Sequence, residues 1–260
     1  MEDLQIAVLA ARAGAAVVQG RFGGHVAAGY KGADDPVTEV DRAAELAILS
    51  VIRANRPDDV ILSEEGGTGA ADGARTWYVD PLDGTVNFMN GIPQVGVSVA
   101  LYADGEAQAA VIIDPLRGEE FTAVAGEGAH LGAGRLAVTD RKVLDNAVVA
   151  TGFPYDHKTR AAEYVRVVEA VLSRVQGIRR MGAATLDLAW VAAGRYDGFW
   201  ELGLAPWDVA AGLLLVREAG GMCTTPDGEP ATPHTRLLVA ANPTVHDRLR
   251  RIVREHHRPD

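Results

Sequence analysis

The sequence has little that is typical of secreted or membrane proteins. It contains a single cysteine, Cys223, so no disulfide bond can form within the chain. No apolar run approaches the length of a membrane span. The first residues, Met1-Glu2-Asp3, include no basic segment, and we therefore expect no signal peptide. Together these absences predict a cytoplasmic protein with no membrane partner.

Basic residues are also too few to suggest nucleic-acid binding. The chain has 25 lysines and arginines against 35 aspartates and glutamates, which gives a formal net charge of −10. Because polynucleotides bind surfaces with excess positive charge, we expect no nucleic-acid polymer as a partner. What the sequence does contain is 48% hydrophobic residues over 260 positions, enough for one large domain or two subdomains.

The most informative stretch is WYVDPLDGTVNF, residues 77–88. Its aromatic and β-branched start is typical of a buried strand, which we expect to end at Pro81 because proline donates no ladder hydrogen bond. Asp80 and Asp83 are three residues apart across a tight turn, so both carboxylates can face one point. The carbonyl of Leu82 between them adds a neutral oxygen ligand. Such a set of hard oxygen ligands suits Mg²⁺.

The next residues favour phosphate binding. Gly84 relieves steric strain at the turn, and Thr85 can begin a helix. The free amides of these two residues at a helix start suit an anionic phosphate. The alternative is structural, since Asp-Gly pairs mark turns and Asp80 or Asp83 would then only cap the helix.

The whole stretch resembles the first signature of the inositol monophosphatase family, within the lithium-sensitive, Mg²⁺-dependent phosphatase superfamily. The resemblance implies a layered α-β-α-β-α sugar-phosphatase fold, of α+β and α/β character, with two subdomains. It also implies a homodimer. Matching motifs on both halves of the chain, described below, extend the resemblance over nearly all of it.

Hydrophobic patterns divide the chain in the same way. Residues 3–22 predict a helix with a wide apolar face, and a second apolar helix follows Thr38. Strand-like runs then predict an antiparallel sheet, at 95–102, 107–113, 120–125 and 129–138. Later strands alternate with predicted helices at 159–175, 183–193, 209–219 and 243–257. We therefore expect an α+β subdomain at 1–142, with most metal ligands, and an α/β subdomain at 143–260.

A second element precedes the second helix. Thr38 and Asp41 are spaced as in a capping box, and from the residues alone capping is the favoured interpretation. The stretch from Asp35 to Asp41 also resembles the family's D-x-V-T-x-x-D element. That resemblance implies that Asp41 faces the metals and helps to orient the attacking water. Lys31 resembles part of a segment that closes near the site.

A pair of glutamates follows the apolar run at 60–62. Adjacent glutamates are usually solvated, which is the structural alternative here. The family pattern has a glutamate pair after a strand, the first of which bridges metals. The resemblance therefore assigns metal binding to Glu64 and a supporting role to Glu65.

The second signature lies in the C-terminal half. PWDVAAG at 206–212, with EAGG at 218–221, resembles the family motif whose aspartate ligates a second metal. Asp208 is that aspartate. Taken alone, an aspartate in a first helical turn is explained by capping and by the helix dipole.

Residues for the alcohol part of a substrate follow from weaker matches. RRMGAA at 179–184 resembles the family's R-x-x-G-[ST]-A segment, in which the backbone of Gly182 and Ala184 approaches the polyol. Ala183 replaces the usual hydroxyl residue there. Glu201 matches the glutamate that accepts hydrogen bonds from inositol hydroxyls, and residues 151–154 resemble a loop at the pocket rim.

The resemblance as a whole implies a Mg²⁺-dependent phosphomonoesterase that converts inositol-1-phosphate to inositol and phosphate with metal-activated water. The implied metal ligands are Glu64, Asp80, the Leu82 carbonyl, Asp83 and Asp208, of which Asp83 and Asp208 also contact the substrate. Thr85, with Asp41, orients the water, Glu64 is catalytic through the metals, and the amides of Gly84 and Thr85 bind phosphate. Lithium is expected to inhibit.

Other functions remain open from the sequence. Fructose-1,6-bisphosphatase, histidinol phosphatase and nucleotide bisphosphate 3′-phosphatase share the fold. A different class is a regulatory interaction protein without catalysis. A complete set of carboxylates argues against that class, because a scaffold has no need to concentrate them.

Overall fold

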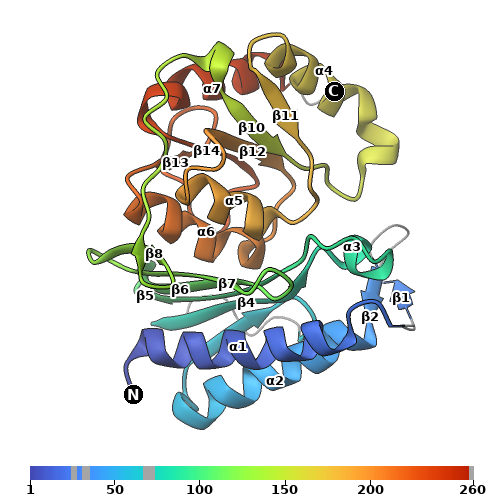
Figure 1. The fold of residues 1–260 in the computed structure, drawn as a ribbon, viewed down its shortest axis with the longest axis vertical. Helices are drawn as coiled ribbons and strands as arrows, with labels where there is room; N and C mark the ends of the chain where they lie inside the picture. Colours follow the sequence, from blue (N-terminus) through green and yellow to red (C-terminus); the bar gives the residue numbers. More distant parts are fainter. Residues whose placement is uncertain (25–27, 31–35, 67–73, 258–260) are drawn as a thin grey trace.

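The computed structural model describes residues 1–24, 28–30, 36–66 and 74–257. Layers of helices and sheets alternate along the long axis (Figure 1). The order of the layers is α1 Asp3–Arg21 with α2 Glu39–Asn55, a first sheet, α5 Ala184–Ala192 with α6 Pro206–Glu218, a second sheet, and α4 His157–Leu172 with α7 Pro243–His256. This arrangement confirms the layered α-β-α-β-α fold predicted above.

The first sheet is mixed. Among the described residues its order is β3 Val60–Ser63, β4 Arg75–Asp83, β5 Gly96–Ala103, β6 Glu106–Asp114, β7 Glu119–Val124, β8 Gly128–Leu131 and β9 Gly134–Arg135. β3 pairs with β4 in parallel, and every later neighbour is antiparallel. The single strand expected at 129–138 is instead a hairpin, because Gly132 takes a left-handed conformation with φ of 55°.

The second sheet is also mixed and comes from the C-terminal half. Its order is β11 Gly177–Arg179, β10 Val148–Thr151, β12 Gly198–Leu202, β14 Leu237–Ala241 and β13 Met222–Thr224. Smaller elements are β1 Ala28–Tyr30, β2 Pro36–Thr38, α3 Thr85–Met89 and the 3₁₀ turn Leu144–Asn146. The two large sheets use residues on opposite sides of position 142, and the division into subdomains there stays our prediction.

The position of α5 and α6 between the two sheets explains why α5 has so few polar residues. Leu186 and Leu188 on α5 and Leu213 on α6 have no exposed surface, because a sheet covers the helix pair on either side. A helix buried all round carries apolar residues all round, which hides helical periodicity in the sequence. Burying each such side chain contributes roughly 1.5–3 kcal/mol to folding.

No helix of the described chain has the length and apolar character needed to cross a bilayer.

The predicted end of the strand before Pro81 was also wrong. β4 does not end before Pro81 but continues to Asp83. The ladder to β5 pairs Asp80 with Ser98 and resumes only at Asp83 with Gly96, so a register shift separates the two pairs. Proline therefore sits in an irregularity where no ladder N–H is needed. Such an irregularity bends the strand and re-aims the side chains on either side of it, here the two aspartates.

Candidate active site

The turn after β4 is built around Asp80 and Gly84. Asp80 is 1% exposed, and its Oδ1 accepts the Leu82 amide at 3.1 Å. Gly84 has φ of 89°, and a Cβ there would lie 2.8 Å from the Gln94 carbonyl oxygen. Only glycine fits this close approach, so α3 can begin directly at Thr85.

Asp41 takes part in both roles that the sequence suggested. Its Oδ2 accepts the Thr38 amide at 2.8 Å, and the Thr38 hydroxyl accepts the Val40 amide at 3.1 Å, which caps α2. Its Oδ1 lies 3.0 Å from the Thr85 hydroxyl. That hydroxyl is also 3.1 Å from the Leu82 carbonyl oxygen, and its one proton can serve only one acceptor at a time. Capping and placement beside Thr85 are therefore compatible.

Asp83 joins the two halves of the chain. Its Oδ2 accepts the Thr185 amide at 2.7 Å and the Thr185 hydroxyl at 2.5 Å, in the first turn of α5. Nearby, the Asn87 amide group donates to the carbonyl oxygens of Gln94 and Met181, both at 2.8 Å. Neither Thr185 nor Asn87 was singled out from the sequence. The bonds of Thr185 to Asp83 and of Asn87 to Met181 join residues 102 and 94 positions apart, which a motif search does not show.

Asp208 lies at the start of α6. Its Oδ2 accepts the Ala205 amide at 2.7 Å, and Pro206 occupies the first helical position. Capping therefore holds here too. Glu64 follows β3, where its amide donates to the Val79 carbonyl at 3.3 Å and places it beside β4. The backbone amide of Glu65 donates to Glu45 Oε1 at 3.1 Å, and the supporting role of Glu65 stays a prediction.

Shared electrostatics place four of these carboxylates in one region. Burial raises the pKa of Asp80 well above its usual value, and the charges of Glu64, Asp83 and Asp208 raise it further. Burial likewise raises the pKa of Asp83 to about 6, against the opposing effect of its bonds from Thr185. Asp208 shows the same direction, from burial first and the Asp83 charge next.

These carboxylates are chemically suited to bind a divalent cation. Burial without a nearby cation strongly disfavours the charged form of a carboxylate, and a bound divalent cation stabilises that form. Within the described ranges, however, no three or more His, Cys, Asp or Glu side chains are already arranged as a metal cage. Several oxygens are instead used in bonds to the chain, such as Asp83 to Thr185 and Asp208 to Ala205. The ligand assignment therefore rests on the donor chemistry and stays a prediction.

The segment predicted to face the alcohol lies across from this turn. Gly182 has φ of 83°, and a Cβ there would be 3.2 Å from the Asn87 side-chain nitrogen. Ala184 is 9% exposed and is the first residue of α5. The carboxylate of Glu201 packs on Gly152, where a Cβ would fall 2.2 Å from either oxygen. Burial raises the pKa of Glu201 well above its usual value.

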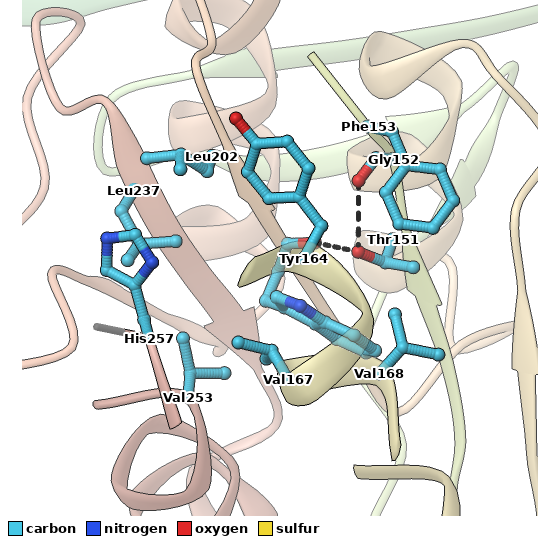
Figure 2. Close-up of a pocket in the computed structure, with 11 residues that line it drawn as sticks. Thr151, Gly152, Phe153, Tyr164, Val167, Val168, Leu202, Leu237, Val253 and His257 are labelled. Atoms are coloured by element: carbon cyan, nitrogen blue, oxygen red, sulfur yellow. Dashed lines mark hydrogen bonds between the residues drawn. The ribbon is translucent and has the colours of Figure 1, made fainter. Parts of the chain in front are cut away.

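A small apolar cavity lies behind the Thr151–Phe153 segment (Figure 2). Val167 and Val168 of α4 and Val253 of α7 line it together with the second sheet. The Thr151 hydroxyl donates to the Trp200 carbonyl at 2.7 Å. None of the predicted ligands lines this cavity, so it is not the phosphate site. Gly152 borders both the cavity and Glu201.

Sequence reasoning overlooked one carboxylate, Asp187. It is 1% exposed, and burial raises its pKa well above the usual value. Its Oδ1 has no hydrogen-bond partner among the residues that the structure describes. Its charge also acts on Glu201. The signal was an acidic residue inside the otherwise apolar helix ATLDLAWVA, residues 184–192.

Lys31, Asp35 and residues 67–73 of the predicted loops lie outside the described residues.

The fold and this site define a class of sugar-phosphatase-like proteins, and comparisons identify the family. Residues 1–258 match the sequence profile of the inositol monophosphatase family, and the chain therefore belongs to that family. The protein is accordingly a phosphatase.

Individual relatives agree with this placement. A protein named Nus factor SuhB from Pseudomonas aeruginosa is 48% identical over 217 residues, covering 82% of this chain and 80% of that protein. An inositol-1-monophosphatase from Rhizobium meliloti is 46% identical over 224 residues, covering 86% and 84%. The solved structure of an inositol monophosphatase from Anabaena superposes with a TM-score of 0.86 at 39% identity, covering 97% and 95%.

Proposed function

We propose that the protein hydrolyses inositol-1-phosphate to inositol and phosphate in a Mg²⁺-dependent reaction. The observation that carries this proposal is the bond of the Asp83 carboxylate to the Thr185 amide at 2.7 Å, which joins the turn of the buried Asp80 to the C-terminal half of the chain. The charges of Glu64, Asp83 and Asp208, which raise the pKa of Asp80 after burial, support it. Family membership and the inositol-1-monophosphatase of Rhizobium meliloti give it further support.

The proposed roles follow the contacts described above. Bound Mg²⁺ would lower the pKa of a water molecule and neutralise charge on the phosphate and the departing alcohol. The residues proposed to hold it are Glu64, Asp80, Leu82 through its carbonyl, Asp83 and Asp208. The Thr85 hydroxyl, held by Asp41 at 3.0 Å, orients the attacking water. The amides of Gly84 and Thr85 would bind phosphoryl oxygens.

The alcohol part of the substrate is proposed to lie against the C-terminal half of the chain. The backbone at Gly182 and Ala184 borders it, and Glu201 would accept hydrogen bonds from inositol hydroxyls. We also keep the proposals of a cytoplasmic homodimer and of lithium inhibition. Light scattering of the purified protein tests the dimer directly.

A phosphate-release panel tests the substrate. It compares inositol-1-phosphate, fructose-1,6-bisphosphate, histidinol phosphate and adenosine 3′,5′-bisphosphate at matched Mg²⁺ concentrations. The highest kcat/KM is expected for inositol-1-phosphate. A clear preference for one of the other three esters would reassign the substrate while leaving the phosphatase class intact.

A second candidate function is a regulatory interaction protein on the same scaffold. The name Nus factor, which SuhB relatives carry at 48% and 44% identity, is not the name of an enzyme. The concentration of buried carboxylates favours catalysis over this candidate. Absence of phosphate release from the whole panel, with the protein folded and Mg²⁺ present, would favour the regulatory function instead.

Substitution of Glu201 by glutamine tests the alcohol side. The amide places an NH₂ donor where an acceptor is wanted, and a charge-assisted hydrogen bond is worth roughly 1.5–3 kcal/mol. We expect kcat/KM for inositol-1-phosphate to fall by on the order of ten- to a hundredfold. p-Nitrophenyl phosphate, which lacks those hydroxyls, should be nearly unaffected. Equal losses on both esters would show that Glu201 supports the site as a whole.

Alanine at Gly152 should act through the same carboxylate. Its new Cβ would fall 2.2 Å from the Glu201 oxygens, so the flexible carboxylate must move while the backbone needs no unusual φ. We expect a loss on inositol-1-phosphate similar to that of Glu201→Gln, with an unchanged melting temperature to within about 3 °C. Gly20→Ala is the matched control, because a Cβ there meets nothing within 4 Å. Unchanged kinetics for Gly152→Ala would refute this placement of Glu201.

A further inference from the structure

Helix α2, which packs against the first sheet, carries two buried carboxylates on one face (Figure 1). Asp41 has no exposed surface, and Glu45 is 7% exposed. Residues four apart lie one above the other on a helix, about 6 Å along its axis. Ile48 and Ile52 continue the same row and pack in the core. A carboxylate is rarely buried in such a row unless it is hydrogen-bonded or paired.

Glu45 is bonded to the loop that carries Glu64. Its Oε1 accepts the backbone amide of Glu65 at 3.1 Å. The next residue packs on the same oxygen, since a Cβ on Gly66 would lie 3.2 Å from it. On the other side of the loop, the Glu64 amide donates to the Val79 carbonyl oxygen of β4 at 3.3 Å. The backbone at Glu64 is therefore held between α2 and β4.

One turn earlier, Asp41 holds a second part of the candidate site. Its Oδ1 lies 3.0 Å from the Thr85 hydroxyl. The loop of Glu64 follows β3, whereas Thr85 begins α3, and both are bonded to neighbouring turns of α2. Because a helix is stiff over a single turn, these two bonds fix the spacing between the Glu64 loop and Thr85.

We propose that Glu45 is a positioning residue, which holds the backbone at Glu64 so that this carboxylate binds a divalent cation together with Asp80. The inference rests on the proposed function, because it takes Glu64 as a metal ligand. The charge of Glu64 raises the pKa of Asp80, after burial, so the held loop already brings the two carboxylates near each other. Glu45 itself acts through the Glu65 amide and touches neither metal nor substrate.

Two substitutions separate the reach of Glu45 from its charge. Glu45→Gln removes the charge and keeps an oxygen that can accept the Glu65 amide. Glu45→Asp keeps the charge and withdraws the oxygen by one methylene. Calorimetric titration with Mg²⁺ measures metal affinity without turnover. We expect about a tenfold loss in Glu45→Asp, the lower end for residues that support metal ligands, and about threefold or less in Glu45→Gln.

Two further measurements check the cause of that loss. Hydrogen–deuterium exchange should show the Glu65 amide exchanging at least about fivefold faster in Glu45→Asp, as for a lost hydrogen bond. Phosphate release by this variant should return toward that of the unaltered protein at saturating Mg²⁺, because the ligands themselves are intact. A merely structural role would lower the melting temperature without this dependence on Mg²⁺ concentration.

Glu218 of α6 provides a matched control. Its two carboxylate oxygens accept the amides of Gly126 and Gly128, both at 2.8 Å, so it also holds a turn from a helix. That turn joins β7 to β8 and contains no residue proposed for the site. Glu218→Asp should therefore keep the Mg²⁺ affinity of the unaltered protein.

Three results would overturn the inference. The first is unchanged Mg²⁺ affinity in Glu45→Asp, which would mean that the loop needs no bond to α2. The second is a loss in Glu45→Gln as large as that in Glu45→Asp, which would mean that the charge acts rather than the bond. The third is a similar loss in Glu218→Asp. Failure of the proposed function shows differently, as no heat of Mg²⁺ binding in the unaltered protein.

Discussion

Substitution of Asp80 by asparagine is expected to abolish phosphate release while the protein stays folded. Asparagine keeps the shape of the side chain and an oxygen that can accept a hydrogen bond from the Leu82 amide. In the unaltered protein this amide lies 3.1 Å from Asp80 Oδ1. The substitution removes the ionisable group of a buried side chain whose pKa the charges of Glu64, Asp83 and Asp208 raise. We expect kcat/KM to fall on the order of a thousandfold or more, the size seen when a group that positions charge in a reaction is lost.

The same substitution should not weaken the metal-free protein. Removing a charge from a crowded set of carboxylates relieves repulsion, so the melting temperature without Mg²⁺ should hold or rise. Asp140→Asn, at an exposed position far from these groups in the chain, is the matched control. Activity of Asp80→Asn near that of the control would show that Asp80 is only a turn residue, since the turn bond survives the change.

Much of the fold was predictable because its signals are local. The apolar face of residues 3–22 predicted α1 to within about two residues, and the capping pattern at Thr38 predicted where α2 begins. The strand-like runs at 95–102, 107–113 and 120–125 predicted β5, β6 and β7 and their antiparallel pairing. The end of β4 was missed, because the loss of one ladder bond at Pro81 is absorbed by the register shift beside it.

For the candidate site, the sequence shows the motifs but not the long-range bonds that bring them together. The motifs around Asp80, Asp83 and Asp208 stand out in the sequence, and their shared electrostatics agree with a common location. The bonds that fix this location are long-range. Thr185 is 102 positions from the Asp83 carboxylate it binds, and no local pattern relates the two. Buried groups such as Asp187 escape motif reading for the same reason.

Two interpretations posed as alternatives proved compatible. Asp41 and Asp208 were each explained either by helix capping or by a place in the site. The structure shows both carboxylates accepting a cap bond with one oxygen, Oδ2 in each case. The other oxygen of Asp41 reaches Thr85. A capping bond fixes the rotamer of a carboxylate, so capping is compatible with the role that we propose for each aspartate.

Removal of divalent metal is expected to abolish turnover and to lower stability at neutral pH. Dialysis against EDTA should eliminate phosphate release, and added Mg²⁺ should restore it. A metal that binds only the folded protein at a concentration a hundredfold above its Kd stabilises by about 2.7 kcal/mol, or roughly 5–10 °C in melting temperature for a chain of this length. Scanning calorimetry with and without Mg²⁺ measures this shift apart from activity.

The pH dependence of that shift follows from the raised pKa values. Burial raises the pKa of Asp83 to about 6, above the value of about 4 expected in the unfolded chain. A carboxyl whose folded pKa is raised contributes stability that is fully present below pH 4 and is lost as pH rises through 6. Asp80 and Asp208 act in the same direction. Metal-free protein should therefore melt at a higher temperature at pH 5 than at pH 7.5.

Mg²⁺ should reverse this order, because it binds the ionised carboxylates and releases their protons. The stabilisation by Mg²⁺ should accordingly be larger at pH 7.5 than at pH 5, and the proton release should appear as a buffer-dependent heat of binding. Ca²⁺ should stabilise in the same way without supporting turnover. Retention of full activity after EDTA treatment, or a Mg²⁺ shift that does not change between these pH values, would contradict the assignment of these aspartates as ligands.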